Sequence, residues 1–312
     1  GMADTKSQMR VFFRIWDSDV AASFRRSPVA IVSGVVALVI VLAALLAPWI
    51  APTNPYDPSS LNLMDGFTPP MEPNAFTGNT YLMGTDNQGR DVFSTILYGA
   101  RISLFVGVSA VLLAMALGIS AGLVAGYRGG WVDAVLMRVA DVQLSFPSIL
   151  IALLIFGVAR GIIPPTQREA MAIWVLIVAI GLSDWVQFAR VVRGATMVEK
   201  GKEYVQAARV IGVSPLRILI RHILPNVMGP VLVIATISVA LAIIAEATLS
   251  FLGVGVPPTQ PSLGTLIRIG QQFLFSGEWW ILLFPALTLL ALALSVNMLG
   301  DWLRDALNPR LR

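Results

Sequence analysis

The chain has 312 residues, of which 56% are hydrophobic and only 13% are charged, with a formal net charge of +4. Soluble domains carry about 25% charged residues, so this composition excludes an ordinary water-soluble fold and indicates a membrane protein. The chain has no cysteine and one histidine, which excludes disulfides, thiolate metal sites and multi-histidine metal sites. We expect no metal site and no nucleic-acid partner.

Six segments are long and apolar enough to cross a bilayer, because a transmembrane helix needs about 20 mostly apolar residues. They predict an all-α integral membrane fold with six transmembrane helices. Pro147 interrupts the third segment, where it would free backbone carbonyls and favour a kink or a pathway bend. The expected spans are 29–50, 102–125, 135–158, 171–188, 227–249 and 280–299.

Lysine and arginine set the expected orientation, because cytoplasmic segments of membrane proteins carry an excess of both. Placing the N-terminal tail, 1–28, in the cytoplasm puts 17 of the 22 basic residues on that side. The C-terminal tail, 301–312, and the region 190–226 are then cytoplasmic as well. The five basic residues left outside are Arg90, Arg101, Arg160, Arg168 and Arg268.

Two long segments are expected on the outer side. The first, 51–101, begins with several prolines, which lack an amide donor and fix φ, so it is expected to be extended. Asp91 is a candidate start for a short helix that leads into the second span. The second segment, 251–279, is rich in glycine and proline and is expected to form either a shaped cap over a pore or a simple connector.

The segment 203–225, EYVQAARVIGVSPLRILIRHILP, is too polar for a span and has the pattern of two short helices. Gly212 follows the first helix, at the position that commonly takes a left-handed conformation. Ser214 is a candidate N-cap and Pro215 the first helical residue of the second helix, which is expected to end at Leu224-Pro225. We call this segment the elbow, and its shape suits gripping by another protein.

Three carboxylates fall in or beside expected spans, and intramembrane acids are functional candidates because they are expensive to bury. Asp141 could instead pair with Arg138, one turn away, and Asp184 could reach Arg190. Glu246 has no basic neighbour in sequence. It is expected either to line a pathway or to make a structural hydrogen bond to a neighbouring helix.

Gly118, Gly122 and Gly126 recur every four residues, and small residues at this spacing let helix backbones approach closely in lipid. Ser120 lies among them in a G-x-S-x-G sequence, but that motif needs a strand–turn–helix context and a base. His222, the one histidine, lies in the elbow, so a serine nucleophile is discarded and no catalytic residue is expected. The chain also lacks G-x-x-x-x-G-K-[ST], so any nucleotide must be bound by a partner.

The elbow resembles the coupling segment of ABC importer permeases, the pattern E-A-A-x3-G-x9-I-x-L-P. Gln206 and His222 depart from this pattern at its Glu and Ile positions. The residues that match it are Ala207, Ala208, Gly212, Leu224 and Pro225. Four further stretches resemble the dipeptide/oligopeptide/nickel branch, and the long first outer loop is similar to its C-type subunit. These are GTDNQGRDVFSTILYGARISL, GLVAGYRGGWVDAVLMRVADVQLSFPS, EATLSFLGVGVPPTQPSLGTLI and FPALTLLALALSVNMLGDWLRDALNPR.

The resemblance implies a type I ABC importer permease fold in a bacterial inner membrane, with a five-helix core over 102–300. It implies three kinds of protein partner besides the lipid bilayer: a homologous B-type permease subunit, two cytoplasmic ATPase subunits and an extracytoplasmic substrate-binding protein. ATP and Mg would be bound by the ATPase subunits, and no cofactor is expected in this chain. Small side chains at Ala207 and Ala208 would let the elbow sink into an ATPase groove. The implied coupling residues are Glu203, Gln206, Ala207, Ala208, Arg209, Gly212, Ser214, Pro215, Leu224 and Pro225.

Because peptides are the most frequent substrates in this branch, the resemblance implies a dipeptide or oligopeptide as the substrate. Nickel, glutathione, an opine or another small solute stays open, because the binding protein, which is a separate chain, largely sets selection. A further alternative is a self-sufficient secondary transporter that uses Asp141, Asp184 or Glu246 as ion sites. The absence of an obvious internal repeat counts against this alternative, because many such transporters are built from repeats.

Overall fold

The computed structural model describes residues 19–307, and within them it is helical apart from one isolated bridge between Thr85 and Asp91. Five basic residues of the expected cytoplasmic tails lie outside this range: Lys6, Arg10, Arg14, Arg310 and Arg312. In chain order the helices are α2 (Asp19–Arg26), α3 (Pro28–Leu45), α4 (Ala47–Ile50), η1 (Pro58–Ser60), η2 (Leu63–Asp65), α5 (Val92–Arg128), α6 (Gly130–Leu144), α7 (Ser148–Ile162), α8 (Arg168–Glu199), α9 (Glu203–Val210), α10 (Pro215–Arg217), η3 (Ile218–Ile223), α11 (Leu224–Phe251), α12 (Leu263–Gln271), η4 (Leu274–Ser276) and α13 (Trp280–Ala306).

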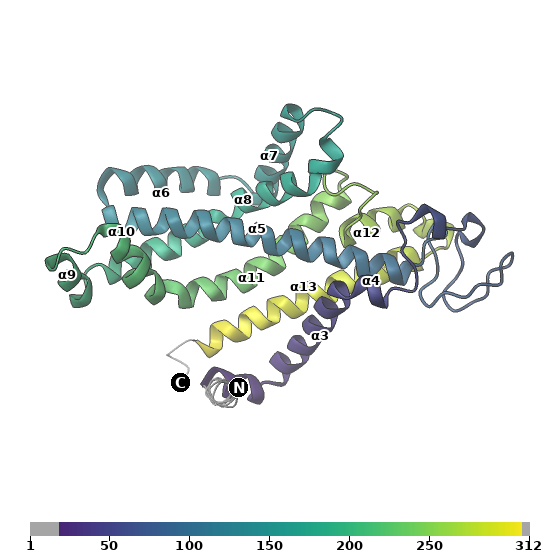
Figure 1. The fold of residues 1–312 in the computed structure, drawn as a ribbon, viewed down its shortest axis with the longest axis horizontal. Helices are drawn as coiled ribbons and strands as arrows, with labels where there is room; N and C mark the ends of the chain where they lie inside the picture. The colour runs from purple at the N-terminus through teal and green to yellow at the C-terminus, as the bar shows by residue number, and fades with distance from the viewer. Residues whose placement is uncertain (1–18, 308–312) are drawn as a thin grey trace, which may run out of the picture.

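The long helices run side by side along the longest axis of the molecule (Figure 1). Among residues 19–307, five helices are long and apolar enough to cross a membrane, or six if a bent pair counts as one span. We call the end that carries α9 and α10 the elbow end, and the end that carries residues 51–91 and α12 the loop end. The all-helical membrane fold predicted from the sequence is therefore confirmed.

The bent pair is α6 and α7, whose axes meet at 98°. The third expected span, 135–158, is thus two helices rather than one, and α7 extends away from the bundle (Figure 1). Pro147 lies at the break, as the N-cap of α7. Because proline has no amide hydrogen and its ring clashes with the preceding turn, it ends α6 here.

The most extensive contact between helices joins α5 and α8. Gly118, Gly122 and Gly126 lie on the face of α5 that touches α8. A Cβ atom at Gly122 would lie 2.6 Å from the carbonyl oxygen of Ala189, and one at Gly126 would lie 2.7 Å from that of Arg193. The two backbones thus touch where α5 has no side chain, which is the geometry that small residues allow in lipid.

At the loop end, α5 starts well before the apolar part of its sequence. Asp91 is its N-cap and accepts a hydrogen bond from the Ser94 amide at 3.2 Å. Burial raises the pKa of Asp91, while its hydrogen bonds to Ser94 oppose that rise. The helix expected from Asp91 is therefore confirmed, and it is continuous with the second span.

The segment 251–279 contains α12, a helix that the sequence prediction missed. Ser262 and Thr265 cap its start reciprocally, a capping-box arrangement in which threonine takes the place of the glutamate or glutamine of the usual sequence signature. The neighbouring α13 begins beside the first outer segment, since the Trp280 indole donates a hydrogen bond to the Thr85 carbonyl at 2.8 Å. This hydrogen bond ties the segment 51–101 to the start of α13.

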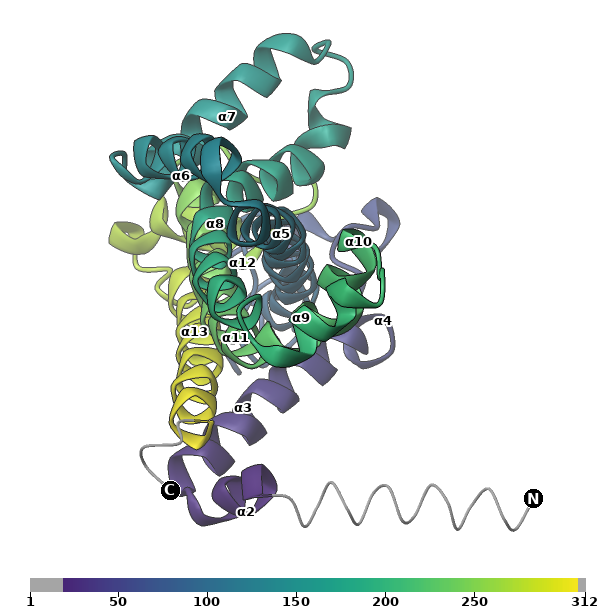
Figure 2. The same ribbon diagram turned by 90° about the vertical axis from the view of Figure 1, so that its left-hand side faces the viewer.

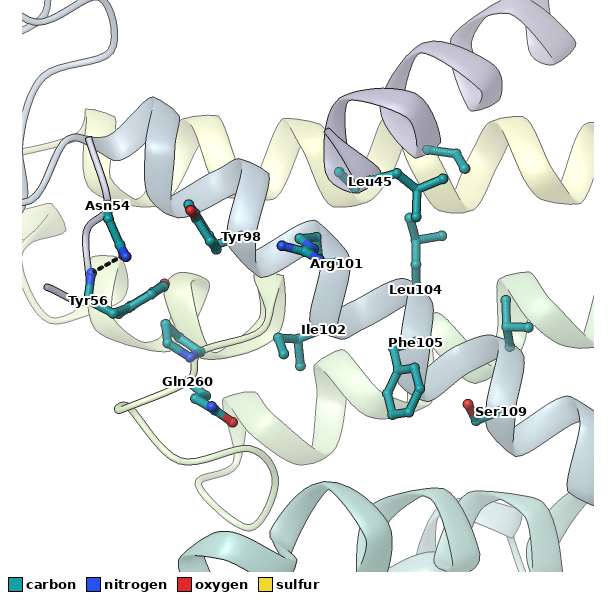
Figure 3. Close-up of a pocket in the computed structure, with 14 residues that line it drawn as sticks. Leu45, Asn54, Tyr56, Tyr98, Arg101, Ile102, Leu104, Phe105, Ser109 and Gln260 are labelled. Atoms are coloured by element: carbon teal, nitrogen blue, oxygen red, sulfur yellow. Dashed lines mark hydrogen bonds between the residues drawn. The ribbon is translucent and has the colours of Figure 1, made fainter. Parts of the chain in front are cut away.

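The N-terminal helix α3 packs beside α5 and α13 and breaks before α4, where Pro48 follows Ala47. Between α3 and α5 lies a cavity of about 730 Å³ with mostly apolar walls (Figure 3). Tyr98 and Arg101 lie on its α5 side.

Candidate functional site: the elbow

The first half of the elbow is α9, and it ends in a Schellman motif. The Val213 amide donates to the Ala208 carbonyl at 3.0 Å, and the Gly212 amide donates to the Arg209 carbonyl at 3.1 Å. Gly212 has a φ of 85°, a left-handed conformation that is cheap only for glycine. The C-cap expected at Gly212 is confirmed.

The second half of the elbow begins as expected but does not end as expected. Ser214 caps it, because its hydroxyl oxygen accepts a hydrogen bond from the Arg217 amide at 3.4 Å, and Pro215 is the first helical residue. The chain then passes through the π-helical turn η3 directly into α11. The prediction that Leu224-Pro225 ends the helix is wrong.

The π-helical turn explains why Pro225 does not break this helix. The Leu224 amide donates to the Leu219 carbonyl, one residue further back than in an α-helix. In a regular α-helix, the ring of Pro225 would clash with the carbonyl four residues earlier and its missing amide would leave that carbonyl unpaired. The wider turn accommodates the ring, and the elbow is thereby continuous with a membrane span.

Tyr204 attaches α9 to the ends of two spans. Its hydroxyl donates a hydrogen bond to the Glu199 carboxylate at the end of α8, and it accepts one from the Asn226 amide of α11 at 3.1 Å. Lys202 also reaches Glu199, at 2.7 Å. Burial and then the hydrogen bond to Glu199 raise the pKa of Tyr204, so the hydroxyl keeps its proton at neutral pH.

Ala208 does not have the position that the resemblance implied. Its side chain is buried against the chain's own core, together with Val205, Ile218 and Ile223. A larger residue at Ala208 would therefore disrupt the elbow itself rather than a contact with a partner. Ala207 is exposed, as a residue that meets a partner must be.

The polar residues of α9 lie on the surface of the elbow. Glu203, in the first turn, is exposed, where a negative charge favours the helix dipole. The Gln206 side chain donates a hydrogen bond to the Gly201 carbonyl at 3.4 Å. Arg209 donates to the Tyr127 hydroxyl at 3.2 Å and lies over that ring, 4.9 Å from its centre. The side chains of Gln206 and Arg209 therefore both contact other residues of this chain.

Three large apolar side chains stand exposed at the turn of the elbow, and the sequence prediction did not single them out. Val210 is 85% exposed, Ile211 is 78% exposed and Leu216 is 67% exposed. We call these three residues the elbow patch. Val210 and Leu216 belong to α9 and α10, with Ile211 between them, and Figure 2 shows these two helices projecting toward the viewer beside α5. Because Tyr204 holds α9 to α8 and α11, the elbow patch projects from an anchored frame.

The three candidate intramembrane acids have three different environments. Asp141 is exposed and forms an ion pair with Arg190 of α8, rather than with Arg138. Asp184 lines a cavity of about 240 Å³ beside the α6–α7 bend, and it has no hydrogen-bond or ion-pair partner among residues 19–307. The structure therefore does not pair Asp184 with Arg190.

Glu246 is fully buried and joins three elements. The Ser250 hydroxyl donates to one carboxylate oxygen at 2.7 Å, and the Ser103 hydroxyl of α5 lies 3.4 Å from the other. Ser103 in turn accepts a hydrogen bond from the Leu263 amide of α12 at 3.1 Å. This arrangement corresponds to the structural alternative, a hydrogen bond to a neighbouring helix. Ser120, the discarded nucleophile, donates to the Ala116 carbonyl of its own helix.

The fold and the elbow together define a multi-span membrane protein with a projecting helical element. Residues 118–312 match the family model described as binding-protein-dependent transport system inner membrane component, and residues 15–70 match the N-terminal transmembrane domain of oligopeptide transport permease C. The chain belongs to this family. It is the membrane-spanning permease subunit of an ABC transport system rather than the ATPase, and the family implies ATPase and binding-protein partners.

Curated relatives match almost the whole chain. A relative from Brucella suis is 41% identical over 278 residues, covering 89% of this chain and 86% of the relative. The dipeptide transport system permease protein DppC of Haemophilus influenzae is 37% identical over 291 residues, covering 93% of each. The oligopeptide transport system permease protein OppC of Bacillus subtilis is 37% identical over 298 residues, covering 96% of this chain and 90% of that one.

The fold is also similar to a solved structure. The MetNI methionine ABC transporter, in an inward-facing conformation, has a chain that matches with a TM-score of 0.53 and 18% identity, covering 69% of this chain and 97% of that chain. At this identity the likeness supports the fold alone.

Proposed function

We propose that this chain is the C-type permease subunit of a peptide importer and that its elbow patch docks in a groove of an ATPase subunit. The relatives named for dipeptide and oligopeptide transport support the peptide substrate. The observation that carries the docking proposal is the exposure of Val210, Ile211 and Leu216 on a frame tied to α8 and α11.

In this proposal a homologous permease subunit completes the pathway, and two ATPase subunits bind ATP and Mg. The elbow end and both termini face the cytoplasm, where ATP is, and the loop end meets the binding protein. Closure of the ATPases moves the elbow. Tyr204 and the continuous helix through Pro225 then pass that motion to α8 and α11, which gives alternating access to the two sides.

The test replaces Ile211 by aspartate in the full transporter and measures how much ATPase subunit purifies with the permease. A charge at a buried apolar contact is expected to cost about 2 kcal/mol or more, which weakens ATPase binding at least about 30-fold. Phe275→Asp is the matched control, because Phe275 is 96% exposed at the loop end, and it should retain the ATPase. Unchanged ATPase recovery with Ile211→Asp would refute the docking proposal.

A further inference from the structure

The five basic residues expected on the outer side are unusual, because most of the basic residues lie on the other side of the membrane. Arg90 is used by the chain itself, since its guanidinium bonds the Pro55 carbonyl at 3.2 Å and pairs with Asp86 at 3.5 Å. Arg101 lies in the cavity beside α3. The remaining three, Arg160, Arg168 and Arg268, converge on one other cavity.

This cavity, which we call the outer basic pocket, has a volume of about 510 Å³. Arg160 comes from the end of α7, Arg168 from the start of α8 and Arg268 from α12, so the three arginines line the cavity from separate elements. Figure 1 shows the connection between α7 and α8 beside the loop that follows α11, whose residues 253–258 complete the wall. Small-molecule sites have volumes of about 300–1,000 Å³.

The guanidinium groups keep most of their hydrogen-bond donors free. The side chains of Arg160 and Arg268 form no ion pair or hydrogen bond with residues 19–307. The side chain of Arg168 uses only its Nε atom, which lies 3.4 Å from the Ile163 carbonyl. A Cβ atom at Gly253 would lie 2.6 Å from a terminal nitrogen of Arg268. The backbone of the 253–258 loop therefore lies directly against this guanidinium, where a side chain would displace it.

The pocket is also complementary to a small zwitterion or anion with apolar groups. Glu169 is its one carboxylate among the lining residues, and it accepts a hydrogen bond from the Thr259 hydroxyl. Phe156 and Val175 contribute apolar wall. Three cations repel a free metal ion, whereas arginine forks bind carboxylates through paired hydrogen bonds.

We propose that the outer basic pocket binds the α-carboxylate of the transported peptide after the binding protein releases it. This inference rests on the proposed function. The α-carboxylate is common to all unmodified peptides whatever their side chains, so a pocket that recognises it selects peptides without selecting sequence. The apolar wall then takes the C-terminal side chain.

The experiment uses the complete transporter in proteoliposomes, with the binding protein outside and ATP inside. It measures uptake of a tripeptide and of its C-terminal amide, each presented at equal saturation of the binding protein. The variants are Arg160→Gln and Arg268→Gln, and the control is Arg101→Gln, an arginine of the loop end outside the pocket. Thermal unfolding midpoints check that each variant is folded.

Loss of one arginine–carboxylate contact is expected to slow uptake of the free tripeptide about tenfold. The amide should be imported slowly by the unchanged transporter, and neither substitution should slow it further. The control should resemble the unchanged transporter with both peptides. Uptake that no variant alters would overturn the proposal.

A third pattern would also overturn it. If the arginines bind an acidic surface of the binding protein instead, both substitutions will slow the two peptides equally and will weaken stimulation of ATP hydrolysis by peptide-free binding protein. Failure of the proposed function is distinguishable, because the unchanged transporter would then show no ATP-dependent uptake of the tripeptide at all.

Discussion

The α5–α8 contact and the elbow each contain a glycine that other residues cannot easily replace. Gly122 in α5 has ordinary helical backbone angles, but no space exists for a Cβ atom because the backbone of α8 lies 2.6 Å from where it would be. Gly212 in the elbow has no neighbouring atom within 4 Å of its Cβ position, but its φ is 85°. One position is limited by volume and the other by conformation, so the two should respond to different substitutions.

The comparison also separates two roles within the permease. The glycine face of α5 is covered by α8 of the same chain, so these two helices pack directly against each other. The elbow patch is not covered by other residues of the described chain, because Val210, Ile211 and Leu216 are mostly exposed. The first region holds two spans together, and the second is the region to which our docking proposal applies.

Gly122→Leu has the largest expected effect on folding. Its Cβ atom alone would lie 2.6 to 2.9 Å from backbone and Cβ atoms of α8, so the two helices must separate, at a cost of about 3 kcal/mol. The thermal unfolding midpoint of the purified protein in detergent should fall clearly. Gly194→Leu is the matched control, because Gly194 of α8 has no atom within 4 Å of its Cβ position; equal midpoints for the two variants would contradict the volume argument.

Gly212→Val is expected to have a smaller effect, because the cost is backbone strain of about 1–3 kcal/mol. The protein should remain folded in the membrane, while peptide uptake per ATP hydrolysed falls as the elbow changes shape. Gly212→Asn should retain much more coupling, because asparagine tolerates the left-handed conformation. The ratio of uptake to ATP hydrolysis checks both variants, and valine and asparagine variants that behave alike would show that φ is not the constraint.

Tyr204→Phe has the smallest expected effect of the three. It removes the hydroxyl that joins Glu199 to Asn226, a loss of about 1 kcal/mol. Assembly with the ATPase should be normal, because the elbow patch is unchanged, whereas uptake per ATP should fall modestly. A normal uptake ratio in this variant would remove Tyr204 from the path of motion.

The sequence predicted those features of the elbow that depend on neighbouring residues. Gly212 and Ser214 are local signals, and the structure confirms both caps. It did not predict the burial of Ala208 or the continuity through Pro225, because both depend on contacts and on a π-helical turn that no single residue type encodes. The exposure of Ile211 was also missed, because residue type alone does not distinguish an exposed apolar side chain from a buried one in a membrane protein.

The same division holds for the rest of the fold. The apolar runs predicted the spans, and Pro147 predicted a bend, although its angle of 98° follows from where α7 packs. The convergence of Arg160 and Arg268 could not be predicted, because more than 100 residues of sequence separate them. Only the folded loops bring them to one cavity.

The central claim is that the elbow patch lies inside an ATPase groove, and single-cysteine cross-linking tests it most directly because the chain has no cysteine of its own. Ile211→Cys in the assembled transporter should cross-link to cysteines introduced along the ATPase surface groove, and the yield should change when ATP is added. Phe275→Cys, which is even more exposed but lies at the loop end, should give no such product. If Ile211→Cys forms no cross-link to the ATPase with or without ATP, the elbow patch does not dock there and the account is wrong.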